Sequence, residues 1–111
     1  MPTLDLIREI VATYERHGWN LRRVLLRPEV SAAVGLEPRN VFENAQLFES
    51  DFNALWFARP SHAGREAWEL RLISEQPYAL FEAFEADETE EDREEARREM
   101  ENRMREQTTR P

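Results

Sequence analysis

The apolar residues of this chain are distributed very unevenly, and this limits where a hydrophobic core can form. Residues 1–84 contain 41 of the Ala, Val, Ile, Leu, Met and aromatic side chains, whereas residues 85–111 contain four. All eleven aromatic side chains lie between Tyr14 and Phe84. Because burial of apolar surface drives folding, the core must come from the first 84 residues. We therefore expect a single domain, with a compact part in 1–84 and a charged C-terminal helix with a frayed tail in 85–111.

Charge divides the chain at nearly the same place. The sequence has 15 arginines and no lysine against 23 acidic side chains, which gives a net charge of −8. Residues 82–106 alone carry five arginines and twelve acids, a net charge of −7. Such a protein repels nucleic-acid phosphates and anionic lipid headgroups, so we expect neither a nucleic-acid nor a membrane partner.

The residues that the sequence lacks exclude several kinds of chemistry. Without cysteine there is no disulfide, thiolate metal site or cysteine nucleophile, and without lysine there is no Schiff base. His62 and Glu66 would offer two metal ligands, but a hairpin loop does not place them on one helical face. A serine nucleophile is usually held at a strained turn, and none of the serines lies in a sequence typical of such a turn. The serines are Ser31, Ser50, Ser61 and Ser74. We expect no catalytic residue, no metal and no cofactor.

No run of apolar residues approaches the roughly 20 that a membrane span requires. The first residues, Met1–Asp5, also lack the charged and then apolar pattern of a signal peptide. We therefore expect a cytoplasmic protein of bacterial type.

The first third of the chain predicts a helix, a strand and a short helix. Residues 3–17 have apolar side chains at helical spacing, with Thr3 suited to the N-cap and Gly18 to the C-terminal cap. Residues 21–26 favour a strand at an edge of the sheet, although they do not alternate cleanly. Pro28 suits the first position of a short helix over 28–34. Residues 41–52 suit a bent strand or an irregular packed loop equally well.

From residue 53 to residue 84 the apolar period is two, which predicts an antiparallel meander of strands over 53–59, 66–74 and 78–84. With residues 21–26, this gives an α+β fold with a sheet of about four antiparallel strands. If Arg59 pairs with Glu66, then Phe57 faces Trp68 in a hairpin. The register of 78–84 is left open. The predicted core comprises Ile7, Val11, Tyr14, Leu55, Phe57, Trp68, Leu70 and Leu72.

The C-terminal segment predicts a charged helix that begins near Asp87. Thr89 and Asp92 resemble a capping box, and acids precede arginines as the helix dipole favours. Its apolar stripe contains only Ala96, Met100 and Met104, so we expect weak docking and fraying beyond about Glu106.

The surfaces are better functional candidates than any single group. We expect a partner surface on the sheet face opposite the core, made by Trp56, Arg71, Glu69 and Ala58. As a second possibility, Met100 and Met104 of the last helix form a seam with a helix of a partner. Trp and Arg are enriched at binding hot spots, and an open sheet face or edge favours pairing with another copy. In the other interpretation a terminal helix covers this face, and both faces of the sheet are core.

These observations predict a non-enzymatic interaction or adaptor protein that forms a homodimer, with the small, acidic character of bacterial secretion chaperones. The alternative is a small-molecule-binding or catalytic domain with a pocket between the N-terminal helix and the sheet. A cleft that holds Arg71, Glu69 or Tyr78 would favour that alternative.

Overall fold

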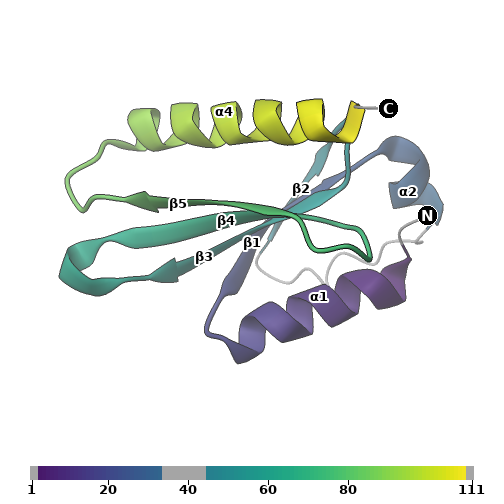
Figure 1. Cartoon of the computed structure of the whole chain (residues 1–111), viewed down its shortest axis with the longest axis horizontal. Helices are drawn as coiled ribbons and strands as arrows, with labels where there is room; N and C mark the ends of the chain where they lie inside the picture. The colour runs from purple at the N-terminus through teal and green to yellow at the C-terminus, as the bar shows by residue number, and fades with distance from the viewer. Residues whose placement is uncertain (1–2, 34–44, 110–111) are drawn as a thin grey trace.

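The computed structural model describes residues 3–33 and 45–109. Within these residues five strands form one sheet, with α1 on one face and α4 on the other (Figure 1). The elements follow in the order α1 (Leu4–Arg16), β1 (Asn20–Leu26), α2 (Pro28–Ala33), β2 (Gln46–Glu49), β3 (Ala54–Pro60), the short 3-10 helix η1 (His62–Gly64), β4 (Glu66–Leu72), β5 (Ala79–Phe84) and α4 (Glu90–Thr109). The predicted α+β class with an N-terminal and a C-terminal helix is confirmed.

The helix α1 begins and ends where the sequence predicts. The Thr3 hydroxyl accepts a hydrogen bond of 3.1 Å from the backbone N–H of Leu6, which satisfies one of the free donors of the first turn. At the other end Gly18 has a φ of 85°, a conformation that glycine adopts without steric cost. Ile7, Ile10 and Val11 are buried against the sheet.

The prediction of about four antiparallel strands is wrong in two respects. In the part of the chain that the structure describes, the sheet has five strands in the order β2-β1-β3-β4-β5, and β1 pairs with β2 in parallel. Therefore β1 lies inside the sheet rather than at its edge. Residues 46–49 supply the additional strand, while 41–44 lie outside the described residues. A bulge between Leu21 and Arg23 explains why β1 does not alternate cleanly, because it adds one residue to the strand.

The β3–β4 hairpin is confirmed, but its predicted register is wrong by one residue. Pro60, rather than Arg59, pairs with Glu66. As a result Phe57 lies opposite Glu69, and Trp68 lies opposite Ala58. Because side chains alternate along a strand, this change places Phe57 and Trp68 on opposite faces of the sheet.

The sheet therefore separates two hydrophobic cores. The core on the α1 face contains Ile7, Ile10, Val11, Trp19, Leu21, Val24, Leu26, Val30, Leu55, Phe57, Ala67 and Ile73. The core on the α4 face contains Leu25, Phe52, Ala54, Trp56, Ala58, Trp68, Leu70, Phe84, Met100 and Met104. Six of the eight predicted core residues are buried, whereas Tyr14 and Leu72 are partly buried.

The helix α4 is docked along the sheet by more than its thin apolar stripe. Thr89 caps it by accepting from the backbone N–H of Asp92 at 3.1 Å. Arg23 of β1 makes two hydrogen bonds to the carboxylate of Glu94, at 2.8 and 2.9 Å. The helix continues to Thr109, so the fraying expected beyond about Glu106 is not observed.

Candidate functional site

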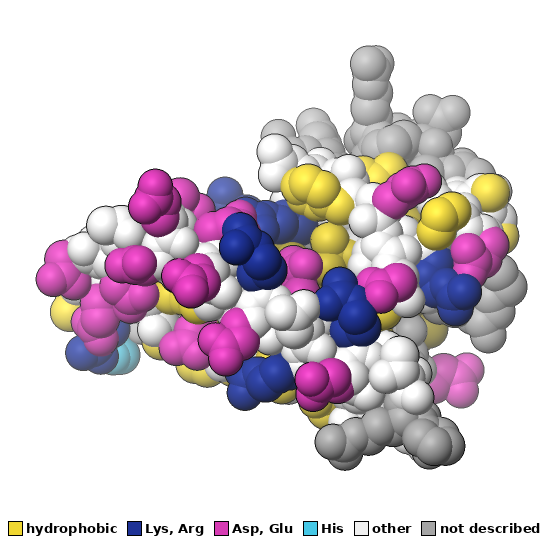
Figure 2. All heavy atoms as spheres, turned by 90° about the horizontal axis from the view of Figure 1, so that it is seen from above, with side chains coloured by type: hydrophobic (Ala, Val, Ile, Leu, Met, Phe, Trp, Pro, Cys, Tyr) yellow, Lys and Arg dark blue, Asp and Glu magenta, His cyan; other side chains and the backbone are white. Residues whose placement is uncertain are grey.

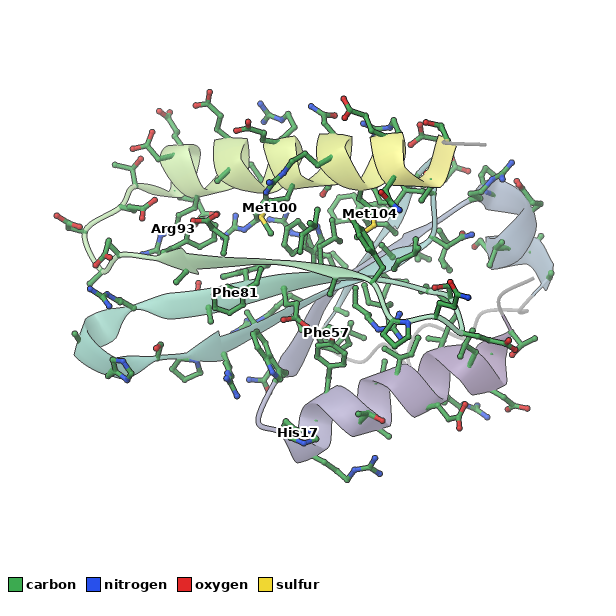
Figure 3. All side chains as sticks on the ribbon, viewed as in Figure 1. His17, Phe57, Phe81, Arg93, Met100 and Met104 are labelled. Carbon is green, nitrogen blue, oxygen red and sulfur yellow. The ribbon has the colours of Figure 1, made fainter. Side chains whose placement is uncertain are left out.

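The structure separates the predicted partner surface into two parts that lie on opposite faces of the sheet. Trp56, Ala58, Met100 and Met104 are buried between the sheet and α4. Figure 3 shows both methionines directed from α4 toward the strands. Glu69 lies opposite Phe57 and therefore faces α1. The structure supports the interpretation in which a terminal helix covers the Trp56 face, and that helix is α4.

Trp56 is held inside the chain by polar and aromatic contacts. Its side chain is 0% exposed, and its indole N–H donates to Glu101 of α4 at 2.9 Å. Its ring packs edge to face against Trp68, with 5.8 Å between the centroids. A buried indole N–H needs a hydrogen-bond partner, and α4 provides one. Trp56 is thus unavailable to a partner while α4 is docked.

The outer surface of α4 is charged. Figure 2 looks onto this helix and shows acidic side chains and arginines over most of it, with hydrophobic groups to one side. The exposed large hydrophobic side chains of the described residues are Leu47, Phe48 and Phe81. Leu47 and Phe48 belong to the short edge strand β2, and Phe81 belongs to β5, the strand at the opposite edge.

Glu69 lies at the boundary between α1 and the uncovered part of the sheet. It accepts a hydrogen bond from the Tyr14 hydroxyl, and the Tyr14 ring stacks on Phe57 with centroids 4.0 Å apart. Burial of the Tyr14 phenol raises its pKa, and the bond to Glu69 and the negative charge of Glu69 raise it further. The Tyr14–Glu69 pair therefore contains a neutral phenol and anchors α1 on β4.

Arg71 is also engaged within the chain. Its guanidinium donates to the backbone carbonyl of Leu72 and, at 3.4 Å, to that of Ser74. These bonds hold the guanidinium against the turn that leads to β5.

The uncovered part of the sheet lies on the α1 face of β5. Ala79, Phe81 and Ala83 share this face and are all exposed, and Phe81 retains 55% of its accessible surface. The Phe81 ring meets Trp19 edge to face at 6.4 Å, and Figure 3 shows it on the side of the ribbon that faces α1. We call Ala79, Phe81 and Ala83 the β5 strip. In the sequence this segment is an apolar run with one charged residue, which indicates an apolar surface. The run does not indicate which of its two faces stays uncovered.

Two hollows on the surface bear on the expectation of a ligand pocket. One, of about 600 Å³, lies where α1 meets the sheet and is lined by Thr3, Leu6 and residues 72–76, with Glu75 as its one titratable side chain. The other, of about 480 Å³, lies between α4 and the β1–β2 edge. Two of its arginines are already paired, Arg23 with Glu94 and Arg105 with Asp51 at 2.7 Å. Neither hollow is lined by Arg71, Glu69 or Tyr78.

Residues 3–33 and 45–109 contain no group of three or more His, Asp or Glu side chains that could hold a metal ion. Within the same ranges, every helix is too short or too polar to cross a lipid bilayer.

Comparison of the chain with protein-family models, with curated proteins and with solved structures found no match.

Proposed function

We propose that this protein is a non-enzymatic interaction module that binds another protein chain at the β5 strip. The observation that carries the proposal is the position of Phe81, a large aromatic side chain that is more than half exposed at an edge of the sheet. Aromatic side chains, phenylalanine included, are enriched in protein interfaces relative to the rest of the surface, and an exposed sheet edge presents unpaired backbone groups to a partner.

The surroundings of Phe81 favour a protein partner over a small ligand. The Phe81 ring packs edge to face against Trp19, so Phe81 is held in place although it is exposed. Glu69 and Arg71, the nearest charged groups on the same face of β4, are already bonded to Tyr14 and to backbone carbonyls. This leaves an apolar strip beside polar groups that are already hydrogen-bonded, and the centres of protein interfaces are apolar in this way.

Affinity capture from cells tests the proposal through a matched pair of variants. Phe81→Asp places a charge in the β5 strip, and Phe48→Asp places the same charge at a side chain of β2 with similar exposure, 43%. We expect the wild-type protein and Phe48→Asp to retain the same bound proteins, identified by mass spectrometry, and Phe81→Asp to lose them. Unchanged capture by Phe81→Asp, with both variants folded by circular dichroism, contradicts the proposal.

A further inference from the structure

The backbone hydrogen bonds of β5 determine which of its residues present free groups at the edge of the sheet. The backbone N–H of Leu72 donates to the carbonyl of Tyr78 at 2.9 Å, so these two residues form a hydrogen-bonded pair. Along an antiparallel ladder, hydrogen-bonded and non-hydrogen-bonded pairs alternate. In the β4–β5 register, Leu80 and Glu82 therefore bond to β4. The backbone N–H and C=O groups of Ala79, Phe81 and Ala83 point away from the sheet.

This pattern is symmetrical about Phe81. We propose that a second copy of this chain pairs with the first through β5, antiparallel and centred on Phe81, so that the two sheets become continuous. The inference rests on the proposed function, because it names the partner that the β5 strip binds. In this arrangement Phe81 lies opposite Phe81 of the second copy, and Ala79 lies opposite Ala83.

The centre of the pairing follows from the number of bonds that each register allows. Centring on Phe81 brings three outward-facing residues of each copy opposite one another, with two hydrogen bonds for each of the three pairs. A shift that centres the pairing on Leu80 or on Glu82 leaves only two such pairs. Centring on Glu82 also places two carboxylates directly opposite each other, which is destabilising. Phe81 is therefore the favoured centre.

The side chains of β5 are compatible with this pairing. The two small alanines allow close approach on the α1 face, and the two phenylalanine rings meet between them. On the α4 face Glu82 lies opposite Leu80 of the second copy rather than opposite another acid. The strand contains no proline, lysine or arginine, the residues by which natural edge strands commonly prevent pairing.

The net charge of the protein opposes association of two copies, so the dependence of dimerisation on salt is informative. Each copy carries a net charge of −8, and salt screens repulsion between the two copies. The dimer should therefore become tighter as ionic strength rises. An interface held together by complementary charges would weaken instead.

Because the chain contains no cysteine, a single introduced cysteine reports the register directly. The Cα atoms of a hydrogen-bonded antiparallel pair are about 5.5 Å apart, within the range that a disulfide spans. Phe81→Cys should form a disulfide-linked dimer under mild oxidation. Ala83→Cys is the matched control, since the two introduced thiols would lie four residues out of register and stay unlinked. An equimolar mixture of Ala79→Cys and Ala83→Cys should form the mixed disulfide.

Sedimentation of the wild-type protein over a wide dilution series completes the test. We expect a reversible monomer–dimer equilibrium that Phe81→Asp abolishes, with circular dichroism unchanged because Phe81 is exposed. A wild-type protein that stays monomeric, or equal crosslinking of Phe81→Cys and Ala83→Cys, overturns the inference. If the protein is monomeric and Phe81→Asp still loses a different bound protein, the inference fails while the proposed function stands. If Phe81→Asp changes neither self-association nor capture, both fail.

Discussion

Arg97 lies in the interface between α4 and the sheet, and replacing it tests what holds α4 in place. Its side chain is 2% exposed, and its guanidinium carbon lies 4.0 Å from the centre of the Trp68 ring and 5.3 Å from that of Phe84. One guanidinium nitrogen donates to Glu90 at 2.7 Å, but that carboxylate is 73% exposed, and Nε has no hydrogen-bond partner. We infer that Arg97 stabilises the interface mainly through contact with the two rings.

The expected energies follow from that geometry. Arg97→Ala removes a buried side chain at least as large as methionine, and truncations of this kind cost about 2–5 kcal/mol. Arg97→Met keeps most of the contact with Trp68 and Phe84. The substitution to methionine loses a cation–π attraction of about 1–2 kcal/mol. It also relieves the wild-type protein of a buried guanidinium with an unpaired Nε, and the penalty for burying that group is of similar size. We expect the free energy of unfolding to fall by about 3 kcal/mol in Arg97→Ala and by less than about 1 kcal/mol in Arg97→Met.

Urea unfolding at one protein concentration, followed by circular dichroism and tryptophan fluorescence, measures these differences when the slope with denaturant stays constant. Arg103→Ala is the control, because Arg103 is exposed on the same helix and its loss should change stability by less than about 0.5 kcal/mol. Equal losses in Arg97→Met and Arg97→Ala would refute the reasoning, since the charge rather than the contact would then hold α4.

Three further outcomes follow from the same structure. Leu70 is 0% exposed beneath α4, so Leu70→Ala should lower the free energy of unfolding by about 2–5 kcal/mol in urea, and a smaller loss would mean that this core is loosely packed. The hydrogen bond from Arg23 holds the pKa of Glu94 below its ordinary value of 4.5, so this contribution to stability is present above about pH 4.5 and is lost as the pH falls below it. Glu94→Gln should flatten the acid side of the stability–pH curve, and an unchanged acid side would contradict the assignment. Burial and Glu69 raise the pKa of Tyr14 above its ordinary value of 10.0, so its contribution is complete below pH 10 and declines as the pH rises further. Thermal melts in alkali should show a smaller decline for Tyr14→Phe than for the wild-type protein.

The elements whose signals are local could be predicted from the sequence. The helix α1 has its cap at Thr3, its glycine at Gly18 and a continuous apolar face between them, all within one segment. The helix α4 likewise has a capping threonine and an ordered sequence of acids and arginines. Caps and short-range periodicity depend only on neighbouring residues, so they do not require knowledge of the rest of the fold.

The sheet was decided by tertiary structure, because contacts between distant residues set its register and its faces. All five residues from Ala54 to Ala58 are buried, so both faces of β3 are apolar, and the period of two in this segment could not specify which face meets which helix. The hairpin loop and the neighbouring strands set the pairing of Pro60 with Glu66. The parallel pairing of β2 with β1 joins residues 23 positions apart in the sequence and has no local signal.

The candidate site predicted from the sequence differs from the one in the structure because it, too, depends on contacts between distant residues. Trp56 and Glu69 were expected on one exposed face, but the register places them on opposite sides of the sheet, and α4 then covers Trp56. Arg97 lies outside the predicted apolar stripe of Ala96, Met100 and Met104, yet it contacts the rings of Trp68 and Phe84 once α4 is docked. Phe81 remains exposed because it belongs to the edge strand β5, where its ring contacts Trp19 edge to face but is not covered by a helix (Figure 1). The sequence by itself determined which side chains are apolar, where α1 begins and ends, and which threonine caps α4, because these are local properties. Which apolar side chains are covered was decided by the packing of α1 and α4 on a five-stranded sheet, since burial depends on partners that lie far away in the chain.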